Sequence, residues 1–183
     1  MAIRTMWCAL TVLLLAGGAS AQEPEAPKEM ELYKHDVGEW ECDMKMWTDP
    51  SAEPMATKGT ESNRMLGGMW LISHFKADFG GMTFEGCGQF GYDVEKKKYV
   101  GAWVDSMNPF ASHMEGTYDA ATKTLTQYGT GKNPDGSPMK SKSVVVYKDG
   151  GRVFTMYSQG PGGKDDWIKM MEIVYKKAAA PAK

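Results

Sequence analysis

The sequence predicts an all-β protein, in which an antiparallel meander closes into an approximately ten-stranded β-barrel behind one short helix. After Gly38, apolar and polar residues alternate in run after run, which is the period of a half-buried strand. Turn-forming Gly, Pro, Asn and Asp residues separate the runs, and no connection contains a helical crossover pattern. Parallel strands need such crossovers, so the sheet must be mostly antiparallel. Closure into a barrel removes the exposed edges of a sheet of this size.

Each strand is placed where the alternation lies between two turn signals. The first expected strand shows the pattern clearly, because Trp40, Cys42 and Met44 alternate with charged residues. Ahead of it, Met30, Tyr33 and Val37 recur at roughly helical spacing, which predicts the short helix at residues 29–37. The ten expected strands are residues 40–46, 57–66, 69–79, 82–92, 98–107, 111–118, 124–129, 140–148, 152–158 and 167–176.

The ends of the chain have a different composition from its body. Residues 1–21 have the form of a signal peptide, with Arg4, an apolar stretch at 6–16 and small residues at the expected cleavage site after Ala21. Residues 22–28 and 178–183 are expected to be a disordered tether and tail around one calycin-like barrel domain at 29–177. We therefore expect export to the periplasm or the extracellular space. The apolar stretch is too short to span a bilayer, and no later segment is apolar enough.

The net charge and the sequence motifs argue against several classes of function. The chain has a net charge of −2 with mixed signs, which argues against a nucleic-acid partner. No Gly-x-Ser-x-Gly or Walker sequence occurs, and Asp105 and Ser106 are adjacent on a strand and so point to opposite faces. We therefore expect no catalysis and no cofactor, although the sequence leaves enzyme activity open.

Residues 86–91 spell Gly-x-Gly-x-x-Gly, which in a dinucleotide-binding protein lies between a strand and a helix. Here a turn and another strand follow, so we expect these glycines to relieve crowding where a barrel strand bends or bulges. Strand parity places Cys42 inside the barrel and Cys87 outside it, which disfavours a disulfide. A bulge at the glycines would reverse that parity, so the pairing stays open.

Several short motifs together resemble the bacterial family known as domain of unknown function 1579. They are VGEW at 37–40, RMLGGMWL at 64–71, FEG at 84–86, GYD at 91–93, WVDS at 103–106, EGTYD at 115–119 and MEIVY at 171–175. The resemblance covers nearly all of the chain after the signal peptide. It implies a calycin-like (lipocalin-like) barrel in which Trp40 packs across the floor, and it implies no catalytic residues.

The abundance of aromatic residues and methionines suggests a binding function for such a barrel. Many of these residues share strand parity, and ten strands leave more interior space than eight. We expect a monomeric protein that binds a small apolar or amphipathic molecule in an internal cavity. The expected ligand-binding residues are Trp40, Met44, Trp70, His74, Trp103 and Met171.

Two other hypotheses remain. His74 shares a strand face with Trp70 and, together with methionines, could bind a metal ion or haem iron in a protein or an enzyme. The simpler interpretation of His74 is a hydrogen-bonded wall residue. In the third hypothesis the protein is a structural or interaction module whose own side chains fill the barrel.

Overall fold

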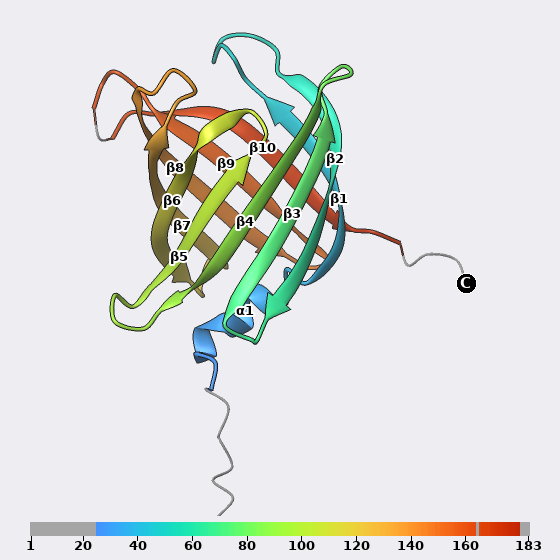
Figure 1. Cartoon of the computed structure of the whole chain (residues 1–183), viewed down its shortest axis with the longest axis vertical. Coiled ribbons are helices and arrows are strands. Elements are labelled where there is room, and N and C mark those ends of the chain that lie inside the picture. The colour runs from blue at the N-terminus through green and yellow to red at the C-terminus, as the bar shows by residue number, and fades with distance from the viewer. Residues whose placement is uncertain (1–24, 164, 180–183) are drawn as a thin grey trace, which may run out of the picture.

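Ten antiparallel strands form one closed barrel in the computed structural model, which describes residues 25–163 and 165–179 (Figure 1). Each strand pairs with its neighbours in sequence, and β1 closes the barrel against β10. The strands are β1 (Gly38–Met46), β2 (Met55–Leu66), β3 (Trp70–Asp78), β4 (Thr83–Asp93), β5 (Lys98–Asp105), β6 (Asn108–Asp119), β7 (Thr124–Lys132), β8 (Pro138–Lys148), β9 (Gly151–Gln159) and β10 (Trp167–Lys177). The predicted fold class and strand number are confirmed. The expected signal peptide at 1–21 lies outside the described residues.

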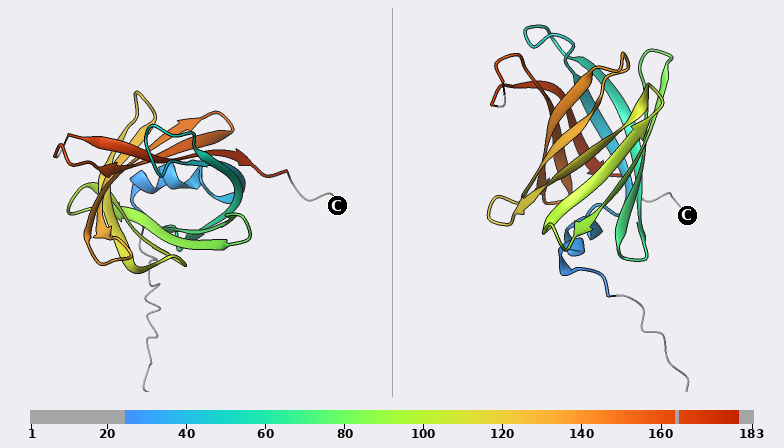
Figure 2. Two further views of the ribbon diagram at one scale, coloured as in Figure 1. Left: turned by 90° about the horizontal axis from the view of Figure 1, so that it is seen from above. Right: turned by 60° about the vertical axis from the view of Figure 1, so that its left-hand side comes forward.

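The predicted helix is present but shorter than the sequence pattern suggested. It consists of a 3₁₀ turn, η1 (Lys28–Met30), followed by α1 (Glu31–Lys34), where residues 29–37 were expected. This segment lies across one end of the barrel (Figure 2). Its side chains Met30, Leu32 and Tyr33 are buried there and form the floor of the barrel. No helix in the described part of the chain is long and apolar enough to span a membrane.

The floor is well packed by aromatic and aliphatic side chains. The ring of Tyr33 meets that of Tyr99 edge to face, with 5.6 Å between centroids, and the ring of Phe90 at 6.2 Å. Leu71 and Leu125 are buried in the same cluster. Burial of these apolar side chains stabilises the helix, which is too short to be stable alone.

The glycines of residues 86–91 make room for aromatic rings. A Cβ atom on Gly86 would lie 2.1 Å from Cζ2 of Trp103 inside the barrel, and one on Gly91 would lie 2.7 Å from Cε3 of Trp70 outside it. The predicted relief of crowding is therefore confirmed. Of the two alternatives, a bend or a bulge, the bulge is excluded, because β4 pairs with both β3 and β5 without a shift in register.

The two cysteines of the described chain lie on opposite sides of the wall and are free. Cys42 is 1% exposed in the barrel interior, whereas Cys87 pairs with His74 and Val104 on the outer face. Because β4 has no bulge, the parity predicted from the sequence holds and the two thiols cannot meet. Burial raises the pKa of the Cys42 thiol to about 12, so it is protonated at neutral pH.

Candidate functional site in the barrel interior

The barrel interior is packed at the helix end and accessible at the other end. On β8, β9 and β10, inward-facing side chains are only partly buried, although they face one another in register. Figure 2 looks down this accessible end onto α1. The partly exposed inward-facing residues of these strands are Ser141, Ser143, Met156, Ser158, Ile168 and Met171.

Four of the six predicted site residues come together on one side of this space. Trp40 and Met44 are 3% and 4% exposed within an apolar cluster that β1, β3 and β10 build. Trp103 and Met171 are partly buried and pack against the same cluster. The predicted interior position of these four side chains is confirmed, and their role in binding stays a prediction.

The other two predicted residues, Trp70 and His74, point out of the barrel. On β3 it is Leu71, Ser73 and Phe75 that are buried, each 3% exposed or less. Trp70 is 40% exposed. The expectation that Trp70 and His74 line the cavity is therefore wrong. The prediction failed because both faces of this strand carry large apolar residues, so hydrophobicity alone does not decide which face turns inward.

The position of His74 also bears on the metal and haem hypothesis. His74 lies on the outer face, whereas Met44 and Met171 lie inside, so the wall separates the imidazole from these thioethers. Among the described residues, no group of three or more His, Cys, Asp or Glu side chains could hold a metal ion. His74 therefore cannot bind a metal ion or haem iron together with the interior methionines.

A buried ionic network joins the helix end to the barrel, and the sequence analysis missed it. Nη1 of Arg152 lies 3.2 Å from Oδ1 of Asp36, and Nη2 contacts the Glu61 carboxylate. The guanidinium also stacks on two rings, 3.9 Å from the centroid of Tyr175 and 4.6 Å from that of Trp40. All three charged side chains are less than 9% exposed. A buried cation thus balances two buried carboxylates.

The same network fixes the segment between α1 and β1. The indole Nε1 of Trp40 donates to the backbone carbonyl of Asp36 over 2.7 Å, and the amide of Asn63 donates to the same carbonyl over 3.0 Å. The Tyr147 hydroxyl donates to Oδ2 of Asp36 over 3.0 Å. Trp40 is therefore bound to the segment that follows α1, while its ring packs in the cluster with Cys42 and Met44 rather than among the floor side chains.

Gln127 supplies a buried donor that no other described residue satisfies. This β7 side chain is 4% exposed, and its Nε2 has no hydrogen-bond partner. In register it lies between Gly116 and Ser143, one step above Leu125 of the floor. Leaving a buried amide unsatisfied costs about 1–3 kcal/mol, so a polar group reaching this depth would find an unused donor.

Asp36 should make the stability of the folded protein depend on pH. Burial raises the pKa of Asp36 to about 6, against the opposing effect of Arg152 and the Tyr147 hydrogen bond, with further influence from Glu61 and His35. Because the folded-state pKa exceeds the unfolded value, the folded state takes up the proton first as the pH falls from 7 to 5. We expect wild-type stability, measured by urea denaturation, to rise over this range by about 1 kcal/mol relative to Asp36→Asn. Equal pH dependence of the two proteins would contradict the assignment.

The comparisons with other proteins agree with this architecture. No curated protein matches the sequence. Rv2717c from M. tuberculosis, a solved structure, is similar in fold, with a TM-score of 0.62 and 9% sequence identity over 85% of this chain and 100% of that one. At that identity the similarity concerns the fold alone. The model of the family described as protein of unknown function (DUF1579) matches residues 25–177. The chain therefore belongs to the DUF1579 family.

Proposed function

We propose that this protein binds a small apolar or amphipathic molecule in the accessible half of its barrel and acts after export. The observation that carries the proposal is the partial exposure of inward-facing residues on β8, β9 and β10. In a barrel filled by its own side chains, these positions would be as buried as the floor residues. Export is proposed from the signal-like pattern of residues 1–21.

The chemistry of the lining favours an amphipathic ligand. Met44, Trp103 and Met171 supply an apolar side, and methionine adapts its shape to irregular ligands. The facing wall carries Ser143 and other hydroxyls, and Gln127 offers a free amide donor at the bottom of the accessible space. A ligand with an apolar body and one hydrogen-bond acceptor satisfies both parts.

We propose binding without catalysis, because the two buried interior carboxylates are already engaged, and the inward-facing Asp105 accepts hydrogen bonds from Trp103 and from the Met107 N–H. Asp36 and Glu61 both contact Arg152 at the floor, with side chains less than 9% exposed. General acid or base work requires a group within reach of a substrate proton. These two carboxylates instead hold the helix end of the barrel together.

Replacing Ser143 with phenylalanine tests the proposed cavity. Ser143 points inward opposite Met156, so the ring should occupy ligand space and weaken binding of the fluorescent fatty acid cis-parinaric acid about tenfold. Titration of the probe's fluorescence measures the change. Val144→Phe is the matched control, because Val144 neighbours Ser143 on β8 and faces outward, and it should leave affinity unchanged.

The alternative is that the barrel serves only as a structural or interaction module. In that case the wild-type protein would not bind the probe, or Ser143→Phe and Val144→Phe would weaken binding equally. Either outcome would contradict the proposed cavity. Thermal denaturation of both variants shows whether they are folded, so that loss of binding is not mistaken for loss of structure.

A further inference from the structure

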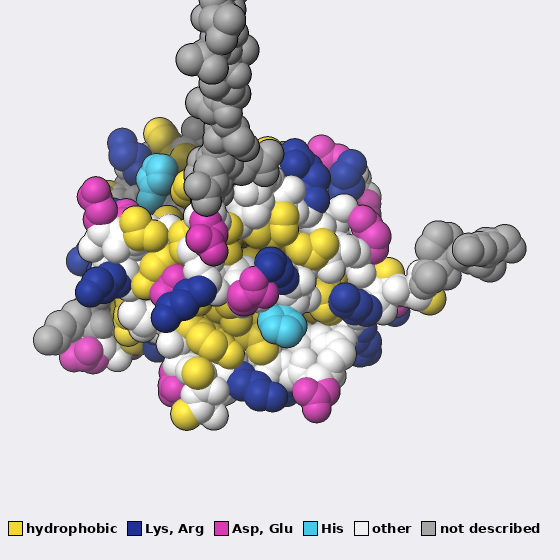
Figure 3. Space-filling view, turned by 90° about the horizontal axis from the view of Figure 1, so that it is seen from below, with side chains coloured by type: hydrophobic (Ala, Val, Ile, Leu, Met, Phe, Trp, Pro, Cys, Tyr) yellow, Lys and Arg dark blue, Asp and Glu magenta, His cyan; other side chains and the backbone are white. Residues whose placement is uncertain are grey.

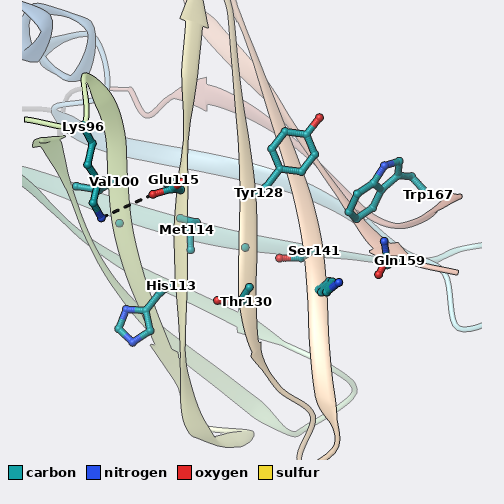
Figure 4. Close-up of a pocket in the computed structure, with 13 residues that line it drawn as sticks. Lys96, Val100, His113, Met114, Glu115, Tyr128, Thr130, Ser141, Gln159 and Trp167 are labelled. Carbon is teal, nitrogen blue, oxygen red and sulfur yellow. Dashed lines mark ion pairs between the residues drawn. The ribbon is translucent and has the colours of Figure 1, made fainter. Parts of the chain in front are cut away.

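A second hollow lies on the outer face of the barrel, away from the proposed ligand cavity. It has a volume of about 600 Å³ and crosses β5, β6, β7 and β8 (Figure 4). Val100, Glu115 and Tyr128 line it, and each alternates with an inward-facing neighbour on its strand. The hollow and the interior therefore lie on opposite sides of the wall. We call it the outer groove.

One end of the outer groove is aromatic. The rings of Tyr128 and Trp167 lie side by side, with 5.8 Å between centroids and 53° between planes (Figure 4). The Lys142 ammonium lies 5.3 Å from the centroid of Trp167 and 4.7 Å from that of Tyr157, which fixes this side of the pair. Tyr128 is 55% exposed, so its ring remains available for stacking.

Charge is distributed unevenly along the groove. On β6, directly opposite Tyr128 in register, Glu115 contacts Lys98 and lies 3.7 Å from Lys96, which also lies 3.9 Å from Asp93. The hydrogen bond and charge of Lys98 hold the pKa of Glu115 below its usual value, so the charges on this side of the groove are paired.

The lysines on β8 differ. Lys140 lines the groove opposite Thr130, Lys142 lies opposite Tyr128, and neither forms an ion pair with any described residue. The overall chain is acidic, so these two ammonium groups form a local positive charge. Such a charge favours an anionic group beside the rings.

We infer that the outer groove binds an acidic saccharide, with one sugar ring stacked on Tyr128 and its carboxylate held by Lys140. A pyranose has apolar faces and polar edges, which matches a ring platform in a groove that Thr130, Gln159 and His113 also line. An acyl chain in the same place would desolvate those polar groups without replacing their hydrogen bonds. The groove is also open to solvent, which suits a ligand that remains partly hydrated.

Isothermal titration calorimetry with trigalacturonic acid tests this inference. The wild-type protein should bind the acidic trisaccharide, and raising the salt concentration should weaken binding. The neutral trisaccharide maltotriose should bind at least tenfold more weakly, because it lacks the carboxylates that pair with Lys140. Failure of the acidic sugar to bind, or equal affinity for both sugars, would overturn the inference.

Three variants locate the site. Lys140→Gln should weaken binding of trigalacturonic acid about tenfold, and Tyr128→Ala about fivefold. Lys58→Gln is the control, since Lys58 is 90% exposed on β2 and its replacement makes the same change in charge. An equal loss in Lys58→Gln would show that only net charge matters, and unchanged affinity in the two groove variants would place the sugar elsewhere.

The inference stands apart from the interior function, and one competition experiment separates them. Saturating the protein with cis-parinaric acid should leave the affinity for trigalacturonic acid unchanged, because the wall separates the two sites. Displacement of the fatty acid by the sugar would place the sugar inside the barrel and overturn the outer groove. Failure of the fatty acid to bind affects the interior proposal alone.

Discussion

Replacing Arg152 with methionine is expected to lower the free energy of unfolding by about 3–5 kcal/mol, because it leaves two buried carboxylates without their cation. Asp36 and Glu61 would each remain enclosed with no counter-charge, and the stacking of the guanidinium on Tyr175 would be lost. Urea denaturation followed by circular dichroism measures the change. Arg64→Met is the matched control, since Arg64 is exposed on β2, and it should cost less than about 0.5 kcal/mol.

A rescue variant separates the charge from the packing. Adding Asp36→Asn and Glu61→Met to Arg152→Met removes the buried charges together, and replacing a whole buried ionic group is often nearly neutral. The triple variant should therefore be more stable than Arg152→Met alone. If it is less stable, or if Arg152→Met costs no more than Arg64→Met, the network does not contribute in the way that we describe.

Replacing Gly86 with alanine is expected to cost about 2–3 kcal/mol, as overpacking does in a well-filled core. The new methyl group would lie 2.1 Å from Cζ2 of Trp103 and 2.7 Å from its Cη2, so the indole must move. Urea denaturation gives the stability, and the tryptophan emission spectrum should shift because Trp103 lines the accessible interior.

A second-site change checks that this clash is the cause. Trp103→Leu should suppress part of the effect, so that Gly86→Ala costs less in that background than in the wild type. Gly131→Ala is a control, because its methyl group would meet the movable Ser112 hydroxyl at 2.7 Å and the Met139 methyl at 3.4 Å. Strict additivity of Gly86→Ala and Trp103→Leu would be evidence against the proposed contact.

Strand positions were predictable because their signals are local. The alternation of Trp40, Cys42 and Met44 and the turn residues between runs placed all ten strands close to their observed bounds. Most differences are at strand ends. Asn108, expected in a turn, begins β6, because the chain reverses at Ser106 and Met107 immediately before it.

The candidate site was only partly predictable, because its key contacts are not local. The orientation of β3 depends on its neighbours, and the sequence of this strand offers apolar residues at both Trp70 and Leu71. Arg152 showed no local signal either, since its partners Asp36 and Glu61 lie 116 and 91 residues away. Only the closed barrel brings these groups together.

The origin of Arg152 in the ninth strand has a consequence for folding. Until β9 joins the sheet, Asp36 and Glu61 have no cation to balance their charges on burial. Docking of α1 therefore becomes favourable only after β9 and β10 have paired and β10 has closed the barrel against β1. Contacts of such high sequence separation form slowly, so we expect α1 to dock late in folding.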